Sequence, residues 1–500
     1  MNLRTHPAGA RLLRRPALFR ALAVAGALWS LAAPAAESAS PETALDRYVR
    51  KPDTAFRWEV AATLEGAGYR AHVVDLVSQT WRAPEEVDRT EWRHWLTVIV
   101  PDAVRHDTAL VWIGGGRNGD PAPERVAERS LRLALETGTV VADLGMVPNQ
   151  PLHMADSPRQ PRLEDDLIAY GRVKYLVTGD EQWLVRLPMV KSGVRAMDAI
   201  QELMRDDRHG GPKAEIARFV VAGGSKRGWT TWLVGAVDER VRAIVPLVID
   251  ALNTEAITRH HFAAYGFFSS ALGDYVRHGL YPHLLGTEGF RRILEIEDPY
   301  LYRDRERLRI PKYVVNASGD QFFLPDNSRF YFRDMPATKH LRYVPNAKHD
   351  LRGSDAQDGV LAWYRAILAD RLLPRFEWTI GADGAIEIRL GAAGARAEPE
   401  DQPREVLLWQ ATNPDARDFR LDIIGRAWTS SALAPTSTGL YRATLPVPER
   451  GWRAFFVELV YDGVGAEPLR FTTDVSVVPD ALPYRLEDHT GPWLEPRARP

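Results

Sequence analysis

Three side chains that together can activate a hydroxyl group each follow a short apolar segment of the chain. They are Ser225, Asp320 and His349. A histidine can take the proton from a serine hydroxyl, and an aspartate can hold the imidazole in the required tautomer and stabilise its cation. The sequence therefore predicts a catalytic triad of Ser225, His349 and Asp320 for acyl transfer.

The serine is set in a segment that favours a sharp turn. Residues 219–229 read FVVAGGSKRGW, an apolar strand that runs into an expected helix. Flanking glycines permit the strand-to-helix turn, the nucleophile elbow, that exposes the hydroxyl. Gly223 fits the usual G-x-S-x-G spacing, but the second glycine comes one residue late, at Gly228. Such a turn can also be purely structural, so the chain order matters: serine, acid, histidine is the order of an α/β-hydrolase.

The acid of the triad has alternatives. Asp320 ends the segment YVVNASGD, which reads as a strand followed by a turn, and His349 follows the next such strand. Asp326 lies six residues further on. Asp250 ends the preceding strand, and some hydrolases take their acid from that position. We expect Asp320 to be the acid and keep Asp250 as the alternative.

Acyl transfer also needs N–H donors for the developing oxyanion. The segment VWIGGGRN at 111–118 places three glycines directly after an apolar strand and upstream of the serine, where such a donor loop is found in this fold. We expect donors from Gly115 or Gly116 and from Lys226. A phosphate-binding loop is disfavoured because a Lys-Ser/Thr pair and the G-x-G-x-x-G spacing are both missing.

Two further features could contact a substrate. Arg227 could attract a carboxylate or phosphate group, or it could hold the following helix through a salt bridge. Residues 253–310 are too long for an ordinary crossover and are rich in aromatic residues, so we expect a cap over the site. His260 is the candidate substrate contact from this cap, although most of its rings should pack in the cap's own core. His260 and the adjacent His261 do not form a metal motif, because neighbouring side chains on a helix face different ways.

The elements around these residues alternate between strands and helices. Short, continuous apolar runs are typical of strands buried on both faces, and helical periodicity lies between them at 163–177 and 189–204. This alternation predicts a doubly wound, mostly parallel sheet. The expected strands are 69–79, 92–101, 108–113, 139–144, 217–222, 242–249, 312–317 and 340–344.

From about residue 375 the pattern changes to short strands joined by turns. This spacing predicts a small, Ig-like β-sandwich. We expect no helix there, and we divide the chain into a hydrolase domain at 37–375, a sandwich at 376–485 and a tail at 486–500. The expected strands of the sandwich are 377–390, 405–411, 419–424, 439–445, 452–461 and 468–478.

The N-terminus indicates export. Five arginines precede an apolar run at 21–33 and the small residues Ala33-Pro34-Ala35-Ala36, which predicts a cleaved signal peptide at 1–36. The run is too short to span a bilayer, which takes ~20 residues. We therefore expect a periplasmic or secreted protein with no integral membrane association after cleavage. The chain has no cysteine, so it is stabilised without disulfides. A formal charge of -2 argues against a nucleic-acid partner.

The mature chain resembles the PhoPQ-activated pathogenicity-related protein family nearly throughout. In that family the serine is expected within Ser-Lys-Arg-Gly, so the late glycine fits. The resemblance implies an α/β-hydrolase-like fold but no substrate. The elbow is also similar to that of glucuronoyl esterases, which favours a carboxylate-containing ester. The segments that carry the family resemblance are LDRYV (45–49), SQTW (78–81), WRHW (92–95), GGG (114–116), PNQP (148–151), GSKRGW (224–229), DALN (250–253), GDQFFLPD (319–326), NPDARDFR (413–420) and GWRAFFVE (451–458).

Together these features predict an exported serine hydrolase that acts on carboxylic esters. Its chemistry needs no metal or organic cofactor, and its substrate is expected to be a small-molecule or glycan-linked ester. Two alternatives stay open. One is a non-catalytic binding or signalling protein on the same scaffold, since the similar autocrine proliferation repressor proteins are secreted signals. The other is a serine peptidase. The oligomeric state is left open.

Overall fold

The computed structural model describes residues 42–206, 208, 214–392, 394 and 396–495. The predicted signal peptide lies outside the described residues, so its presence and cleavage stay predictions. None of the helices in the described residues combines the length and the apolar character of a membrane-spanning segment.

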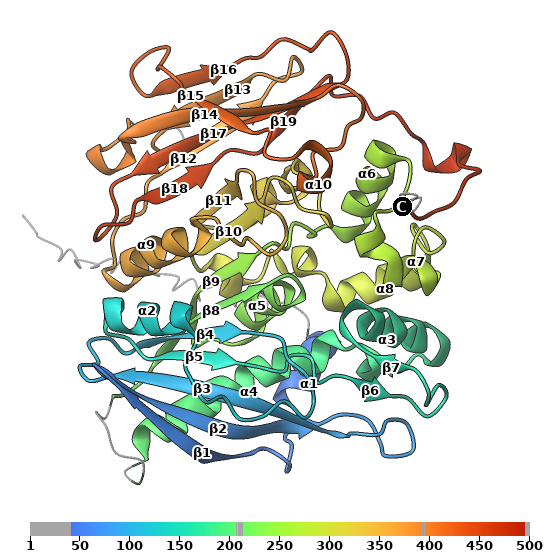
Figure 1. Ribbon diagram of the computed structural model, residues 1–500, viewed down its shortest axis with the longest axis vertical. Helices are drawn as coiled ribbons and strands as arrows, with labels where there is room; N and C mark the ends of the chain where they lie inside the picture. Colours follow the sequence, from blue (N-terminus) through green and yellow to red (C-terminus); the bar gives the residue numbers. More distant parts are fainter. Residues whose placement is uncertain (1–41, 207, 209–213, 393, 395, 496–500) are drawn as a thin grey trace, which may run out of the picture. The chain divides into compact units, whose positions relative to one another are not determined.

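Nine strands form the main sheet, in the spatial order β1-β2-β3-β5-β4-β8-β9-β10-β11 (Figure 1). From β5 to β11 in this order, each strand is parallel to the next. At the other edge β1, β2 and β3 form an antiparallel meander, and β3 is also antiparallel to β5. This order confirms the predicted α/β-hydrolase sheet; β1 is the strand that the sequence did not indicate. The strands are β1 (Arg57–Gly66), β2 (Tyr69–Thr80), β3 (Glu91–Pro101), β4 (Thr108–Ile113), β5 (Val141–Leu144), β8 (Arg218–Gly224), β9 (Val241–Leu247), β10 (Lys312–Ala317) and β11 (Lys339–Val344).

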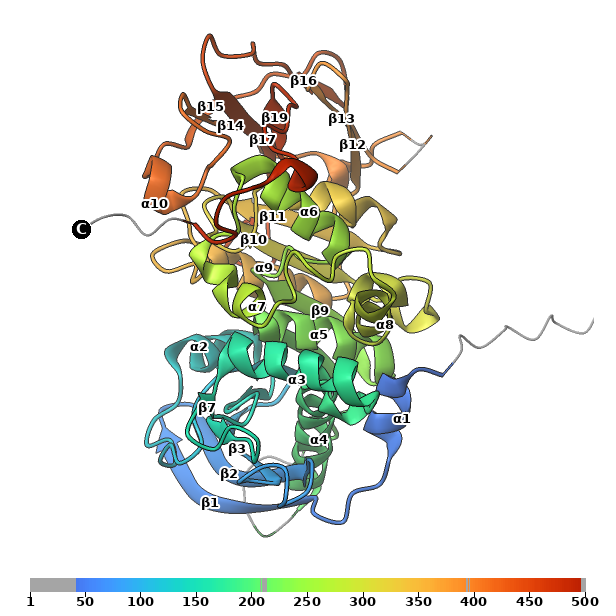
Figure 2. The ribbon, with the colours of Figure 1, turned by 90° about the vertical axis from the view of Figure 1, so that its right-hand side faces the viewer.

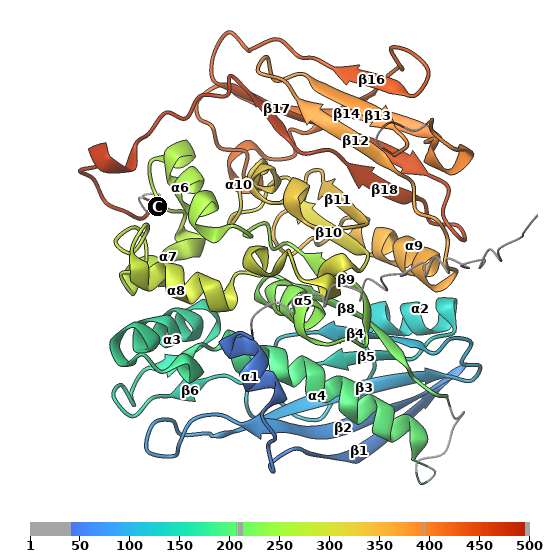
Figure 3. The same cartoon turned by 180° about the vertical axis from the view of Figure 1, so that it is seen from behind.

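Helices cover both faces of this sheet. Figure 3 shows α1 (Ala44–Arg50), α4 (Arg186–Arg205) and α5 (Lys226–Val237) in front of the strands. On the other face lie α2 (Glu128–Thr137) and α9 (Ala356–Leu368). Because both faces are covered, all six residues of β10 are buried. Two separate hydrophobic clusters form the core, one on each side of the sheet.

The segment between β9 and β10 contains the whole of the predicted cap, residues 253–310. It contains α6 (Thr254–Tyr265), α7 (Gly273–Arg277) and α8 (Glu288–Glu297). In Figure 2, α7 and α8 lie above α3 (Glu164–Thr178), which comes from an earlier part of the chain. The Tyr275 hydroxyl donates to Asp165 at 3.0 Å and so ties α7 to α3. The predicted cap therefore packs against α3, a helix that belongs to another part of the chain.

Two antiparallel sheets follow α9 and share one hydrophobic cluster, as a sandwich requires. Backbone and side-chain bonds join this region to the main sheet; for example, Tyr343 N–H donates to Thr472 Oγ1 at 3.0 Å. The chain from Glu42 onward packs as one unit, so the predicted domain boundary stays a prediction. The strands are β12 (Phe376–Ile380), β13 (Ile386–Leu390) and β16 (Leu440–Ala443) in one sheet, and β14 (Glu405–Asn413), β15 (Thr429–Ala432), β17 (Trp452–Tyr461), β18 (Leu469–Thr472) and β19 (Ser476–Val478) in the other.

Two predictions for the C-terminal region are wrong: the strand at 419–424 and the absence of any helix. Residues 419–424 do not form a strand; their last four residues are the short helix α10 (Leu421–Ile424). The Leu421 N–H donates to the Gly319 carbonyl oxygen at 3.0 Å, so the segment docks on the turn before Asp320 instead of pairing with a strand. Tertiary packing here overrides the apolar pattern of the segment.

Candidate active site

Ser225 occupies a strained turn between β8 and α5. Its backbone has φ 56° and ψ -129°, a conformation that residues other than glycine rarely adopt. The Ser225 N–H donates to the Leu247 carbonyl oxygen of β9 at 2.8 Å, and the Ser225 carbonyl accepts from the Trp229 N–H in the first turn of α5. Backbone strain of this kind costs about 1–3 kcal/mol and persists only where surrounding contacts impose it. This is the geometry expected of a nucleophile elbow.

The glycines around Ser225 are required by close approach of the backbone. A Cβ on Gly223 would lie 2.8 Å from the Arg227 carbonyl oxygen. A Cβ on Gly228 would lie 2.9 Å from the carbonyl oxygens of both Gly223 and Leu247. The glycine that arrives one residue late in the sequence therefore packs against the strand end, and Arg227 points its side chain elsewhere.

Asp320 and His349 form a hydrogen-bonded pair. Asp320 follows β10 and His349 follows β11, and the distance from His349 Nδ1 to Asp320 Oδ2 is 2.8 Å. A proton on Nδ1 leaves Nε2 as the acceptor of the neutral ring. Nε2 is buried and has no hydrogen-bond partner among the described residues, so Ser225 Oγ does not bond to it in this structure. The His349 ring contacts Phe322, with 4.4 Å between ring centroids.

The glycine loop after β4 reaches the same edge of the sheet as Ser225. β4 pairs with β8 in register, Ile113 opposite Gly223. The carbonyl oxygens of Gly115 and Gly116 accept bonds from Met146 N–H and Gln150 Nε2, but their own N–H groups donate to no residue of the described ranges. Lys226 is the first residue of α5, so its N–H also has no acceptor within the helix. Their role as oxyanion donors stays a prediction.

Two cations beside Ser225 share one carboxylate. Arg227 binds Glu164 through two parallel hydrogen bonds, at 2.8 and 2.7 Å, and Lys226 Nζ lies 2.8 Å from the same side chain. Burial disfavours ionisation of Glu164, but the hydrogen bond and charge of Arg227 and the charge of Lys226 outweigh it and lower its pKa. Arg227 therefore makes the salt bridge that was one of its two expected roles. A contact of Arg227 with substrate stays untested.

A cavity of about 600 Å³, including its opening to solvent, lies beside Ser225. The cap contributes α6, α7 and the segments between them, α3 and α4 contribute two arginines, and the turn after Asp320 contributes two phenylalanines. Because Phe322 also contacts the His349 ring, the Asp–His pair lies against the cavity wall. The lining residues are Asp165, Arg172, Arg186, Ser225, Lys226, Trp229, Ile249, Ala251, Thr254, Ile257, Thr258, His261, Leu272, Tyr275, Tyr281, Phe322 and Phe323.

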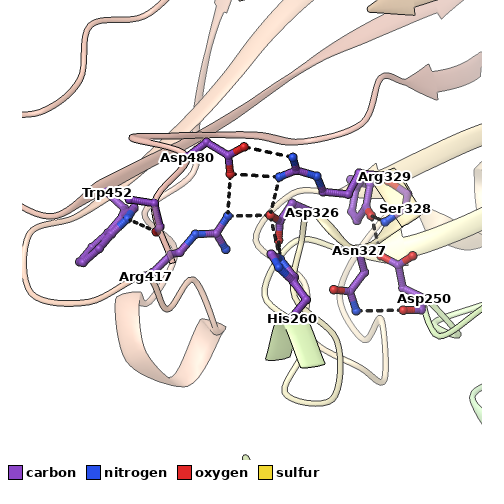
Figure 4. A network of polar contacts seen from close by, with 11 residues as sticks. Asp250, His260, Asp326, Asn327, Ser328, Arg329, Arg417, Trp452 and Asp480 are labelled. Atoms are coloured by element: carbon purple, nitrogen blue, oxygen red, sulfur yellow. Dashed lines mark hydrogen bonds and ion pairs between the residues drawn. The ribbon is translucent and has the colours of Figure 1, made fainter. Parts of the chain in front are cut away.

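Of the two cap histidines, His261 lines this cavity, whereas His260 is not among its lining residues. His260 is buried, and its Nε2 lies 3.0 Å from both carboxylate oxygens of Asp326 (Figure 4). Asp326 also accepts a bond of 2.7 Å from Arg417, which comes from the C-terminal region. The structure thus places His260 and Asp326 in a network that joins the cap to that region.

Asp250, the alternative acid, is occupied elsewhere. Its Oδ2 accepts a hydrogen bond of 2.5 Å from the Tyr343 hydroxyl, and its carbonyl oxygen accepts one from Asn327. Burial raises the pKa of Asp250 well above its ordinary value. The structure brings Asp320, not Asp250, to His349.

Sequence reasoning missed the charged residues behind Ser225. Glu164 begins α3 and Arg172 lies within it, while Arg186 begins α4. Nothing in the sequence distinguished these residues, because the helical segments around them carry several other charged residues. No group of three potential metal ligands occurs among the described residues.

Comparisons with known proteins give the family. The sequence profile of the PhoPQ-activated pathogenicity-related protein family matches residues 45–420. Autocrine proliferation repressor protein A of Dictyostelium discoideum is 37% identical over 468 residues, which cover 88% of this chain and 92% of that protein.

Among solved structures, acetyl xylan esterase 1 from a Thermoanaerobacterium species is 15% identical with a TM-score of 0.44, covering 65% of this chain and 91% of its own. A glucuronoyl esterase from Solibacter usitatus is 17% identical with a TM-score of 0.39, covering 63% and 87%. From the profile match and the curated relative, this chain belongs to the PhoPQ-activated pathogenicity-related protein family.

Proposed function

We propose that the protein is an exported serine hydrolase that cleaves carboxylic esters through an acyl-enzyme on Ser225. The observation that carries the proposal is the Asp320–His349 hydrogen bond of 2.8 Å, together with a buried His349 Nε2 that has no hydrogen-bond partner within the described part of the chain. Ser225, Asp320 and His349 follow β8, β10 and β11, whose carboxyl ends lie at one edge of the sheet. The strained φ of Ser225 supports the same assignment.

In the first step His349 Nε2 takes the proton of the Ser225 hydroxyl as Oγ attacks the ester carbonyl carbon. The tetrahedral intermediate collapses, the bond to the alcohol oxygen breaks, and His349 returns the proton to that oxygen. Water then attacks the acyl-enzyme in the same way and releases the acid. The serine and imidazole must come within hydrogen-bonding distance for this step, and such bonds often form fully only with substrate bound.

The N–H groups of Gly115 or Gly116 and of Lys226 would stabilise the oxyanion. Each such donor typically contributes about 3 kcal/mol to transition-state stabilisation. Gly115 lies directly against the Arg227 side chain, because a Cβ on Gly115 would lie 2.8 Å from Arg227 Nη2. The Arg227–Glu164 pair would thus hold the donor loop against the elbow.

A fluorophosphonate probe tests the proposal because it reacts with activated serines. Folded protein should be labelled on Ser225, and heat-unfolded protein should not. Ser225→Ala should abolish labelling, and His349→Ala should reduce it strongly. Ser354→Ala serves as a matched control, since that hydroxyl instead donates to the Leu351 carbonyl oxygen. Absence of label on the folded wild-type protein would refute the hydrolase.

Export is part of the proposal and rests on the N-terminal sequence. Arginines, a short apolar run and Ala33-Pro34-Ala35-Ala36 support cleavage after Ala36. N-terminal sequencing of the protein from the periplasm or medium should begin at Glu37. An N-terminus that retains the apolar run would refute cleavage there.

A second candidate is a signalling protein that keeps the scaffold without catalysis. It is favoured by the 37% identical relative, which is named as an autocrine proliferation repressor. A Ser225→Ala variant that keeps full effect on growth of the producing cells, together with no probe labelling of the wild type, would favour this candidate. Faster turnover of aminoacyl amides than of esters would instead favour a serine peptidase.

A further inference from the structure

Two buried guanidinium groups line the cavity beside Ser225. Arg172 is 1% exposed and Arg186 is 2% exposed. Arg172 Nε donates to Glu297 at 2.8 Å, a fully buried ion pair. Arg186, in contrast, has no carboxylate within 4.0 Å in the part of the chain that the structure describes. An arginine stays charged at any physiological pH, so Arg186 is a buried cation with no directly bonded counter-ion among the described residues; Glu297 and Asp165 act on its charge only from beyond 4.0 Å.

The contacts of Arg186 leave most of its donors free. Its Nη1 donates to the Lys226 carbonyl oxygen at 2.9 Å, and its guanidinium lies 4.4 Å from the ring centre of Trp229. Its Nε is buried with no acceptor among the described residues, as is Nη2 of Arg172. A buried charge without a partner costs several kcal/mol. Such a cost is explained when a ligand supplies the missing partner.

The charges around the cavity do not balance. Lys226 and Arg227 are paired with Glu164, and Lys226 Nζ also lies 3.3 Å from Asp165. Glu297 is paired with Arg172. Four cations thus face three carboxylates, and the cation left over is Arg186.

Two other titratable groups near the cavity do not supply the missing charge. Burial lowers the pKa of His261 to about 3, so that ring is neutral and adds no charge. Asp298 accepts from the backbone N–H groups of Thr254 and Tyr300 and does not pair with Arg186.

The remaining lining is largely apolar. Ile249, Ile257, Leu272, Phe322 and Phe323 surround the two arginines. An apolar wall keeps the local dielectric low, so a charge-assisted hydrogen bond to an anion is stronger there than in water. The planar fork of an arginine matches a carboxylate in a bidentate arrangement.

We propose that Arg186, assisted by Arg172, binds a carboxylate of the substrate, so that the substrate is a small ester carrying a free carboxylate a few atoms from the scissile carbonyl. The separation follows from the Arg186 bond to the carbonyl oxygen of Lys226, the residue directly after Ser225. The assignment of this carboxylate to a substrate rests on the proposed hydrolase function. The anion site itself can be tested without turnover.

The test compares two small esters of the same shape on Ser225→Ala protein, which cannot form an acyl-enzyme. Methyl hydrogen glutarate carries a carboxylate, and methyl glutaramate carries a neutral amide in its place. Calorimetry should show the charged ester binding about ten- to a hundredfold tighter, as expected for a hydrogen bond to a charged group. Arg186→Gln in the same background should remove this preference, and Arg186→Lys should keep part of it. Equal affinity for the two esters would overturn the proposal.

Stability separates a ligand-binding arginine from a structural one. Arg186→Gln removes a buried charge without a counter-ion, so the melting temperature should stay equal or rise. Arg342→Gln is the matched control, because Arg342 is equally buried but pairs with Asp355 and lies outside the cavity lining. It should lower the melting temperature and leave the ester preference unchanged. A large loss of stability in Arg186→Gln, with the preference kept, would make Arg186 structural.

The two proposals fail in different ways. If the fluorophosphonate probe does not label Ser225 while the charged ester still binds more tightly, the hydrolase is refuted and the carboxylate site stands. If the probe labels Ser225 and the two esters bind and react equally, the carboxylate site alone is refuted.

Discussion

Replacing Asp326 with asparagine tests whether this carboxylate is structural, as its contacts indicate, or part of the catalytic acid. Asp326 is fully buried and accepts hydrogen bonds from His260 and Arg417, with Arg329 3.7 Å away (Figure 4). These three partners come from the cap, the C-terminal region and the segment between β10 and β11. Asp326→Asn removes the charge that holds them together while keeping the shape of the side chain.

The expected loss of stability follows from the burial of the partners. The Arg417 side chain is 1% exposed, and its other carboxylate, Asp480, is 3.8 Å away and half exposed. Removing one member of a buried ion pair costs about 3–5 kcal/mol, because the other charge stays buried without a partner. Asp480→Asn is the matched control; an exposed pair such as its contact with Arg329 contributes only about 0–1 kcal/mol.

Chemical denaturation of both variants, with probe labelling of Ser225, gives the result. Asp326→Asn should lose about 3 kcal/mol more than Asp480→Asn. Under conditions where both variants are folded, both should label at Ser225 as the wild type does. Equal losses of stability would contradict the structural role, and loss of labelling in folded Asp326→Asn would point to a catalytic one.

The same contribution should depend on pH in one direction. Burial opposes ionisation of Asp326, but Arg417 and His260 outweigh it and hold its pKa well below 3.8 in the folded protein. In the unfolded chain an aspartate has a pKa of about 3.9. The stabilisation is therefore complete above about pH 4 and is lost as the pH falls through the folded pKa. The difference between wild type and Asp326→Asn should shrink in that acid window.

Three further predictions concern the site itself. Asp320→Asn should lower kcat/KM for a nitrophenyl ester about 10⁴-fold by favouring the wrong imidazole tautomer, whereas Asp250→Asn should leave most activity, because burial already favours the neutral carboxyl; the reverse pattern would exchange the two acids. Ser225→Gly should have a free energy of unfolding about 1 kcal/mol higher than that of Ser225→Ala in a denaturant titration, because glycine relieves the strained φ of 56°. Equal stability of the two variants would show that the turn is unstrained. Gly228→Ala should lose about 1–3 kcal/mol and most labelling of Ser225, because its Cβ would overlap backbone carbonyl oxygens at 2.9 Å; a variant with wild-type stability and labelling would contradict the close packing.

Much of the main sheet was predictable because its strands are buried on both faces. A short, continuous apolar run such as 312–317 is typical of a strand buried on both faces, and β10 lies where this run predicted a strand. β1 was missed because only one side of it is partly buried, with exposed and intermediate residues alternating along its length. The segment 419–424 was misassigned because its position is fixed by the Gly319 turn, a contact far away in sequence.

The site was predictable only where chain order constrains it. Strand ends present Ser225, Asp320 and His349 in sequence order, so their type and spacing could be interpreted directly. The partners of Arg227 and Arg172 could not, because Glu164 and Glu297 lie far from them in the chain and meet them only through packing of α3, α5 and α8. Which of His260 and His261 lines the cavity likewise depends on how α6 is rotated about its axis. The sequence does not determine this rotation to within one residue.

An acid-quench experiment on Ser225 tests the acyl-enzyme most directly. Wild-type protein mixed with excess 4-nitrophenyl acetate should release a burst of one nitrophenol per active site, and peptide mapping should find the acetyl group on Ser225. The absence of both the burst and the acetyl group on Ser225 would contradict the proposed mechanism. This holds whether or not the folded protein turns over the ester.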